Sequence, residues 1–245
     1  MIAKVQRPRV ICHMTTSIDG RIVVDGWPPS VAATVRREYE EIHATFGAEG
    51  WICGRITMEP FAKRVRTDAQ VEQQYDRNAP RADFRAGQFD SFAFAIDARG
   101  RLAWESNDIG GDHVVAILSE RVSDEYLAFL REKNVSYLLA GESEIDLSLA
   151  LDKIARLFGV RTLLLEGGGR INGTMLREGL IDEVSLIVAA VADGAAGKAS
   201  LFDVDVPAGA SAPQHNPAQL MLRSVEQRPD NIIWLRYDVV TGATR

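Results

Sequence analysis

Three consecutive glycines, Gly167 to Gly169, interrupt the sequence LLLEGGGRIN. Glycine in an ordered element costs conformational entropy, so three together need a reason. The pattern predicts a strand over 160–166 and a helix over 170–179, with the glycines at the junction. Ligands of open α/β sheets bind beyond the carboxyl ends of strands, and a helix start offers unpaired N–H groups. The glycines therefore suit a phosphate cradle, and a tight turn with positive φ is the alternative.

A second junction of this kind lies in WICGRITMEPF. A strand over 50–54 ends at Gly54, and a helix is predicted to open near Arg55. The Arg55 guanidinium could bind phosphate bidentately, and Thr57 offers a hydroxyl. The alternative is a solvated arginine beside a capping threonine. Two junctions of this type favour a ligand with several phosphates.

The stretch MTTSIDGRI carries a third candidate. Asp19 and Gly20 fit a tight turn, which predicts a hairpin between strands over 9–15 and 21–24. Asp19 either caps its own backbone in that turn or belongs to a functional loop.

Alternating strands and helices must position these residues. Ser30 is the predicted N-cap of a helix over 30–46. Further strands are expected over 91–97, 113–119, 135–141 and 182–192, and further helices over 123–133 and 146–159. This repetition predicts one α/β domain over 1–245, with a mainly parallel sheet between helices. The tail over 218–239 predicts an antiparallel hairpin at one edge, and the stretches 66–88 and 191–217 read as irregular loops.

Composition excludes several classes of partner. The net charge of −6 gives no hint of a nucleic-acid face, and no apolar run approaches the ~20 residues of a bilayer span. The N-terminus lacks the apolar core of a secretion signal. Cys12 and Cys53 sit in apolar runs and are expected to be buried free thiols of a cytoplasmic protein. The histidines show no ligand spacing, so no metal site is predicted.

The segments SIDGR, GRIT, IDARGRL and LLLEGGGRINGTMLREGLIDE together resemble the dihydrofolate-reductase-like superfamily. More specifically, they are similar to the C-terminal reductase domain of bifunctional riboflavin-biosynthesis deaminase-reductases. The resemblance extends over most of the chain. It implies a central, mainly parallel mixed sheet flanked by helices, NADPH as hydride donor, and a homodimer. The implied reaction reduces the ribose of a phosphoribosylamino-pyrimidinone, as in 5-amino-6-(5-phosphoribosylamino)uracil reductase, to the ribityl form.

The resemblance also implies roles for individual residues. Asp19 and Glu166 would act as catalytic carboxylates that position substrate hydroxyls or relay a proton. Substrate would be bound by Ser30, His43 and Glu166. The nucleotide would be held by Thr15, Thr16, Gly54, Arg55, Thr57, Ser119, Arg121, Gly167, Gly168, Gly169, Arg170, Ile171 and Asn172. Two of the glycines are expected to be joined by a cis peptide bond.

The residues alone leave other roles open for several of these positions. Glu166 could be an acid stabilised at a helix N-terminus, and His43 a surface residue of its helix. Ser119 and Arg121 could belong to a solvated loop.

The chain departs from the reductase pattern at the substrate end. MEPFAKRVR replaces an Asp-Asp-Pro stretch with a nearby arginine, and Arg64 or Arg66 is a candidate to bind the substrate phosphate instead. GRITME and GGGRI also suit a dihydrofolate or pteridine reductase. Such enzymes carry a carboxylate near the start of the first helix, where this chain reads SVAATV. A third alternative is a non-catalytic nucleotide-binding protein on the same fold.

Overall fold

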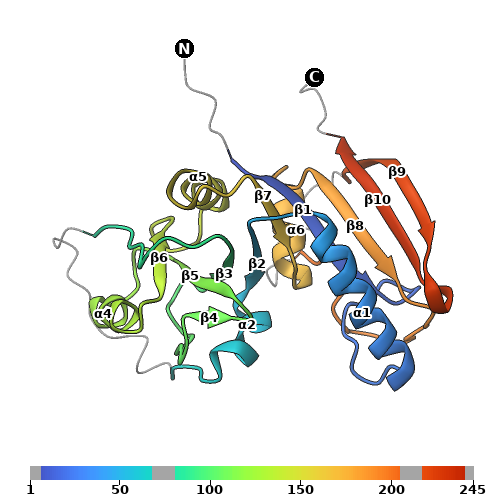
Figure 1. Cartoon of the computed structure of the whole chain (residues 1–245), viewed down its shortest axis with the longest axis horizontal. Coiled ribbons are helices and arrows are strands. Elements are labelled where there is room, and N and C mark those ends of the chain that lie inside the picture. The colour runs from blue at the N-terminus through green and yellow to red at the C-terminus, as the bar shows by residue number, and fades with distance from the viewer. Residues whose placement is uncertain (1–6, 68–80, 205–216, 241–245) are drawn as a thin grey trace, which may run out of the picture. The chain divides into compact units, whose positions relative to one another are not determined.

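The computed structural model describes residues 7–67, 81–204 and 217–240. Its contacts divide the chain into two compact units. Unit 1 comprises Met1–Pro8 and Ala48–Leu163, and unit 2 comprises Arg9–Gly47 and Leu164–Arg245. Strand β7, Thr162–Leu165, carries the chain from unit 1 into unit 2 (Figure 1). No helix in the described ranges is long and apolar enough to cross a bilayer.

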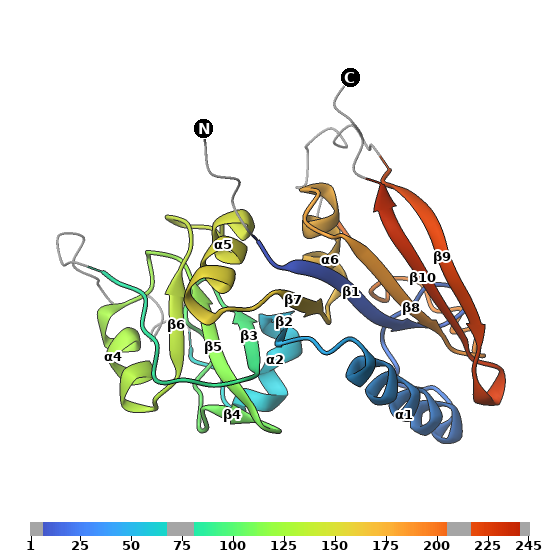
Figure 2. The same ribbon diagram turned by 45° about the horizontal axis from the view of Figure 1, so that its top comes forward.

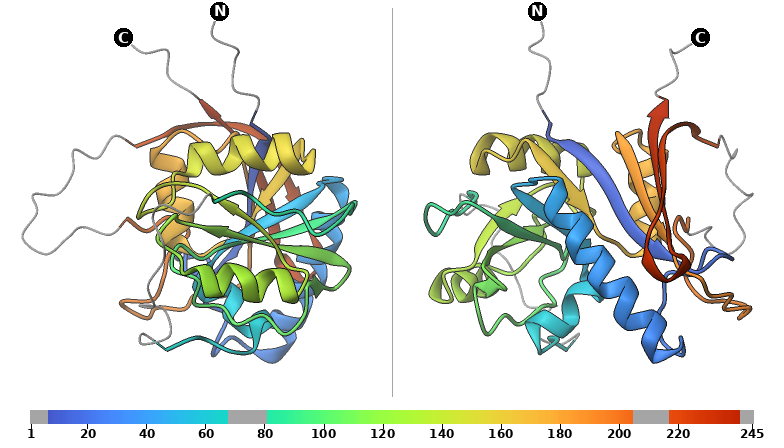
Figure 3. Two further views of the ribbon diagram at one scale, coloured as in Figure 1. Left: turned by 90° about the vertical axis from the view of Figure 1, so that its left-hand side faces the viewer. Right: turned by 45° about the vertical axis from the view of Figure 1, so that its right-hand side comes forward.

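Unit 1 is built on parallel strands. These are β2 (Gly50–Gly54), β3 (Phe92–Ile96), β5 (Asp112–Leu118) and β6 (Ser136–Leu139), and the two-residue β4 (Asp108–Ile109) runs antiparallel to β5. Helices α2 (Arg55–Ala62) and α4 (Asp124–Glu132) lie on one side of these strands, and α5 (Leu147–Phe158) lies on the other (Figure 3, left). Cover on both faces explains why these strands read as apolar runs. Only β4, too short to leave a sequence pattern, was not predicted.

Helix ends in unit 1 follow their capping residues. The Ser123 side chain accepts the N–H of Tyr126 at the start of α4, and Asp146 accepts that of Leu149 at the start of α5. Gly159, with φ 74°, ends α5 in the left-handed conformation. These three boundaries agree with the sequence prediction.

Unit 2 is a mixed sheet between two helices. Strand β1 (Arg9–Thr16) runs parallel to β8 (Glu183–Val188), and β10 (Ile233–Val240) runs antiparallel to β8 and to the edge strand β9 (Gln219–Gln227). The short turn η1, Pro229–Asn231, joins β9 to β10. Figure 2 shows β1 running between α1 (Pro29–Thr45) and α6 (Gly169–Arg177). The predicted C-terminal hairpin and mixed sheet are confirmed.

The core of unit 2 lies between α1 and the sheet. Val35 and Ile42 of α1 pack with Ile187 of β8 and Trp234 of β10 in one buried cluster. Cys12 and Cys53 are both buried thiols outside any disulfide, as the sequence predicted.

Two predictions about unit 2 were wrong. Ser30 is not the N-cap of α1: Pro28 takes that position with an extended backbone, and Pro29, which favours the first helical position, begins the helix. Residues 21–24 do not form a hairpin with β1, because Arg21 pairs with Ser200 in an isolated bridge instead. Residues 22–24 form no strand.

A buried carboxylate joins the strands of unit 2. Glu183 is fully buried on β8 and accepts hydrogen bonds from Arg9 of β1, Arg223 of β9 and Arg236 of β10. The Arg236 guanidinium also lies over Trp234, with its central carbon 5.5 Å from the ring centroid. A buried charge requires such partners, since desolvation would otherwise disfavour it.

The segment 200–203 packs directly against α6. A Cβ on Gly173 would lie 2.1 Å from the carbonyl oxygen of Asp203, and one on Gly169 would lie 2.3 Å from that of Ser200. The N–H of Asp203 donates to the carbonyl of Gly169 over 2.9 Å. Gly169 and Gly173 are therefore needed for close packing.

Asp19 joins two loops of unit 2. Its carboxylate accepts hydrogen bonds from the Ser17 hydroxyl (2.6 Å) and from the N–H groups of Asp193 and Gly194 (both 2.9 Å). These donors, Ser17 first, hold the pKa of Asp19 well below its ordinary value of 3.8. The turn therefore faces the 193–194 segment and does not lead into a second strand.

Gly173→Ala is expected to destabilise the protein. Overpacking costs about 1–3 kcal/mol, which exceeds the ~1 kcal/mol that alanine gains within a helix. Thermal unfolding should show a Tm several degrees lower, while Arg177→Ala on the exposed side of the same helix leaves it nearly unchanged. A Tm for Gly173→Ala equal to that of the wild type would contradict the close packing.

The Asp19 contacts should depend on pH. Because the pKa is lowered on folding, their stabilising contribution is present above pH 3.8 and is lost as the pH falls below it. Amide hydrogen exchange, corrected for intrinsic rates, should show protection of Asp193 and Gly194 decreasing in acid. Asp19→Asn should weaken it already at neutral pH, and the exposed control Asp25→Asn should not. Equal protection in Asp19→Asn would refute this assignment.

Candidate functional site

The predicted site residues fall into two groups, one in each unit. Unit 2 holds Thr15, Thr16, Asp19, Ser30, His43 and the run 166–172, whereas unit 1 holds Gly54, Arg55, Thr57, Ser119 and Arg121. Each group is described within its own unit.

The glycine triplet makes the turn from β7 into α6. Gly167 has a φ of 110°, which only glycine adopts readily, and Gly168 is the N-cap of α6 with φ −33°. No side chain caps this helix, so its first-turn N–H groups lack a side-chain acceptor at the N-cap. All peptide bonds in the described residues are trans, so the expected cis bond is not found. Positive φ at Gly167 makes the turn instead.

Thr15 follows, on β1, the residue that contacts this turn. A Cβ on Gly167 would lie 3.2 Å from the methyl carbon of Met14, the residue that precedes Thr15 on β1. Thr15 Oγ1 is buried without a hydrogen-bond partner in the described chain. Thr16 is buried and its carbonyl accepts the N–H of Ala189. A buried hydroxyl without a partner needs an explanation, and a bound ligand supplies one.

The residues after the triplet divide between solvent and packing. Arg170 is exposed and Ile171 is half-buried. Asn172 is fully buried; its Nδ2 donates to the carbonyl of Leu201 over 3.0 Å, and its Oδ1 has no partner in the described residues. Gly169 and Asn172 thus hold the 200–203 segment. Gly167 and Gly168 lie just before the first turn of α6, and a helix start of this kind can bind an anion.

His43 and Glu166 form a hydrogen-bonded pair. Nδ1 of His43, in the last turn of α1, lies 2.7 Å from Oε1 of Glu166, which directly follows β7. The His43 side chain is 32% exposed and that of Glu166 is 12% exposed, so a small molecule could reach the imidazole. The pair brings together two of the three predicted substrate-binding residues, next to the glycine triplet.

A second histidine lies close by but is structural. His13 is buried on β1 and stacks on Tyr39 of α1 at 4.3 Å between centroids. Nδ1 lies 3.1 Å from Ser185 Oγ, and Nε2 lies 3.3 Å from the Tyr39 carbonyl oxygen. Burial lowers the pKa of His13 to about 4, so it is neutral at neutral pH.

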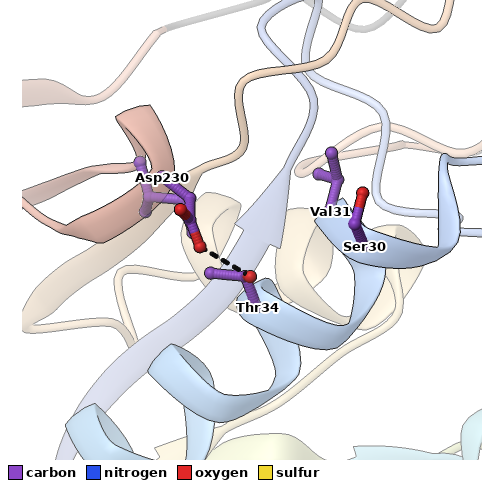
Figure 4. Close-up of a pocket in the computed structure, with 5 residues that line it drawn as sticks. Ser30, Val31, Thr34 and Asp230 are labelled. Carbon is purple, nitrogen blue, oxygen red and sulfur yellow. Dashed lines mark hydrogen bonds between the residues drawn. The ribbon is translucent and has the colours of Figure 1, made fainter.

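Ser30 lies at the other end of α1. It lines a pocket of about 210 Å³ with Val31, Thr34, Asp230 and Ile232, in which Thr34 Oγ1 donates to Asp230 over 2.8 Å (Figure 4). Ser30 and His43 are separated by about 20 Å along the helix, at 1.5 Å per residue. They therefore cannot contact the same part of a small substrate.

Asp19 and Glu166, the two predicted catalytic carboxylates, belong to different networks. Asp19 binds the Ser17 hydroxyl and the 193–194 backbone, whereas Glu166 binds His43. The low pKa of Asp19 keeps it ionised at neutral pH, so it carries no proton to donate.

The unit 1 group lies along one edge of its sheet. Gly54 is paired with Ile96, and Ile96 with Ile117, so the residues that follow β2, β3 and β5 share the carboxyl edge. Arg55 forms an ion pair with Glu59 in α2, whose first-turn N–H groups have no side-chain cap, and Thr57 is half-buried. The Ser119 hydroxyl donates to the Ala98 carbonyl over 2.7 Å, and Arg121 is exposed.

Sequence reasoning missed Asp97, which follows β3 at this edge. Asp97 is buried; Oδ2 accepts the N–H of Leu102, and Oδ1 has no partner among the described residues. Burial raises its pKa, against the hydrogen bond from Leu102 and the charge of Arg55. An acid directly after the apolar run FAFAI was the available signal.

Both candidates for the substrate phosphate are engaged within unit 1. Arg64 forms an ion pair with Glu105 at 3.2 Å. Arg66 donates to the carbonyl of Gly100 over 3.0 Å and lies over the Tyr126 ring. Both arginines thus have partners within unit 1, and binding of the substrate phosphate by either stays a prediction.

The chain is similar to several known proteins. It is 36% identical over 86 residues to the 2,5-diamino-6-ribosylamino-4(3H)-pyrimidinone 5′-phosphate reductase of Methanothermobacter thermautotrophicus, a match that covers 35% of this chain and 39% of that protein. The chain thus matches less than half the length of this curated relative.

Solved structures share the fold. A pyrimidine reductase-like protein from Corynebacterium diphtheriae superposes with a TM-score of 0.66 at 18% identity, covering 97% of this chain and 94% of that one. For the Saccharomyces riboflavin biosynthesis reductase Rib7 the TM-score is 0.56 at 13% identity, covering 98% and 93%. For Acinetobacter baumannii RibD the TM-score is 0.61 at 21% identity, covering 96% of this chain and 58% of that one. At these identities the likeness shows the fold.

The same architecture, a mixed sheet flanked by helices with antiparallel C-terminal strands, is what the resemblance in the sequence implied. The family profile described as the RibD C-terminal domain matches residues 8–233, which is most of the chain. The chain therefore belongs to the RibD C-terminal domain family.

Proposed function

We propose that this protein is an NADPH-dependent reductase of the riboflavin pathway, acting on a phosphoribosylamino-pyrimidine. The main structural support for this proposal is the arrangement of residues at the carboxyl end of β7. There the amides of Gly167 and Gly168 open a helix, Thr15 Oγ1 is buried without a partner in the described chain, and the Glu166–His43 pair lies alongside. The curated relative named for reduction of a ribosylamino-pyrimidinone supports the substrate class.

The residues in unit 2 fit a dinucleotide. The start of α6, which no side chain caps, and the positive end of its dipole suit a pyrophosphate. Thr15 and Asn172 each offer a buried oxygen without a partner in the described residues. When bound, NADPH supplies the hydride, and the protein has to orient the substrate and deliver a proton. Unit 1, taken by itself, offers the α2 start and the exposed Arg121 as proposed phosphate contacts.

The pterin-reductase alternative receives less support. The first turn of α1 carries no acidic residue, as its sequence indicated. Asp230, the acid in the Ser30 pocket, comes from the β9–β10 turn and is hydrogen-bonded to Thr34. Oxidation of NADPH at 340 nm, followed with pyrimidine ribosylamines and with dihydrofolate, separates the two. Turnover of dihydrofolate alone would reverse the assignment, and tight nucleotide binding without any turnover would favour a non-catalytic protein.

Gly168→Val is expected to weaken NADPH binding about 10- to 100-fold, because the side chain blocks hydrogen bonds to a charged group worth ~1.5–3 kcal/mol. Thermal unfolding of the variant checks that the protein remains folded. Fluorescence titration with NADPH and NADH measures the affinity. Gly173→Ala is the matched control, since it should lower Tm but leave NADPH affinity unchanged. Undiminished affinity in Gly168→Val refutes the loop assignment. Equal affinity of the wild type for NADPH and NADH refutes the predicted roles of Ser119 and Arg121 in nucleotide binding.

We also propose that the protein is a cytoplasmic homodimer. Strand β9 lies at the end of the strand order, and its outer backbone groups have no neighbouring strand among the described residues. It exposes several large apolar side chains, namely Leu220, Met221, Leu222 and Val225. A second copy of the chain would cover them. The two buried cysteines outside any disulfide are consistent with a reducing compartment.

Replacing both Met221 and Val225 with Glu should convert the dimer into a monomer, because a charge on each side of the interface is desolvated on association. Sedimentation velocity measures the change. The control Gln219→Glu adds charge at the end of the same exposed strand and should leave the dimer intact. A wild-type monomer, or a doubly substituted dimer, would contradict the proposed interface.

A further inference from the structure

Reduction of a ribosylamine requires a proton as well as a hydride. When hydride adds to C1′ of the ring form, the C1′–O4′ bond breaks and its electron pair stays on O4′. That oxygen must take up a proton to become a hydroxyl of the ribityl chain. A reduced nicotinamide nucleotide supplies the two electrons, so the remaining requirement is a proton donor beside the substrate.

Three titratable groups of unit 2 are unsuited to this step, namely Asp19, His13 and Glu166. Asp19 is held ionised by three donors. His13 is buried, and both of its ring nitrogens already have partners. Glu166 accepts the Nδ1 proton of His43, and so acts as an acceptor.

His43 meets the requirement. The Glu166 carboxylate at 2.7 Å and the carboxyl end of α1 both attract a positive charge at its imidazole. Because Glu166 engages Nδ1, the proton that can be transferred is the one on Nε2, at the opposite side of the ring. The imidazole is 32% exposed, which leaves it accessible to a substrate.

We propose that His43 is the proton donor to O4′ of the ribosylamine and that Glu166 is its positioning residue, an inference that rests on the proposed reductase function. Proton transfer leaves neutral imidazole, which water re-protonates after each turnover. The hydride and this proton together balance the reduction. This assigns catalysis to a histidine at a helix position where the sequence alone left substrate binding or a surface role open.

The test compares His43→Asn, Glu166→Gln and the control Glu40→Gln, an exposed carboxylate on the same helix. Asparagine keeps a polar group near the Nδ1 position and removes the transferable proton. We expect kcat to fall about 100-fold or more in His43→Asn, with KM and NADPH affinity changed less than about threefold. In Glu166→Gln we expect a smaller loss of kcat and a shift of the His43 Nδ1 signal in ¹⁵N NMR. Glu40→Gln should match the wild type in all readouts.

A kcat for His43→Asn within about threefold of the wild type overturns the inference, as does a loss confined to KM, which would mark His43 as a binding residue. An unchanged Nδ1 signal in Glu166→Gln overturns the positioning role. Retained NADPH binding in the variants shows that they are folded. If the wild type binds NADPH but reduces no pyrimidine, the proposed function has failed and the inference with it. That outcome is distinct from an active wild type with an equally active His43→Asn.

Discussion

The candidate site in unit 2 depends on the reversal of the chain after β7. Gly167, in the left-handed region, turns the backbone so that α6 begins two residues later and Glu166 is left facing His43. The same turn places Gly167 against the side chain of Met14 on β1. One backbone conformation that only glycine adopts readily thus sets the positions of the anion-binding groups and of the ionisable pair.

The three glycines of the triplet differ in conformation and surroundings, and the turn explanation applies to Gly167. Gly167 satisfies the turn, and Gly169 allows the 200–203 segment to approach α6. Gly168 lacks the positive φ of Gly167 and lies outside the helix, unlike Gly169. It is therefore the glycine whose missing side chain we propose to admit a ligand. Structural and functional demands are therefore met by adjacent residues and not by the same ones.

The sequence predicted most elements because their signals are local. Apolar runs covered on both faces gave the strands of unit 1, and Ser123, Asp146 and Gly159 mark helix ends through their own side chain or backbone freedom. The failures involve partners distant in the chain. Arg21 pairs with Ser200, about 180 residues away, and no periodicity near residue 21 reports that.

The candidate site shows the same limit. Residue type and resemblance were enough to name the glycines, Glu166 and His43. They did not predict that Nδ1 of His43 would contact Glu166, or that Ser30 would line a pocket at the other end of the helix. Asp97 was not predicted, because an acidic residue after an apolar run is common and the sequence does not show that its carboxyl group is buried.

The Glu183 network bears on how unit 2 would respond to its solvent. Strand β9 buries little side-chain surface, so its attachment relies on the ladder with β10 and on Arg223 reaching the Glu183 carboxylate. Three guanidinium groups share this one buried anion, with Asp238 3.6 Å from Arg223 as a further acid, and an excess of positive charge remains on that face of the sheet. Dissolved anions would compete for the half-exposed guanidinium groups of Arg9 and Arg223, whereas salt screens their attraction to the buried Glu183 carboxylate much less.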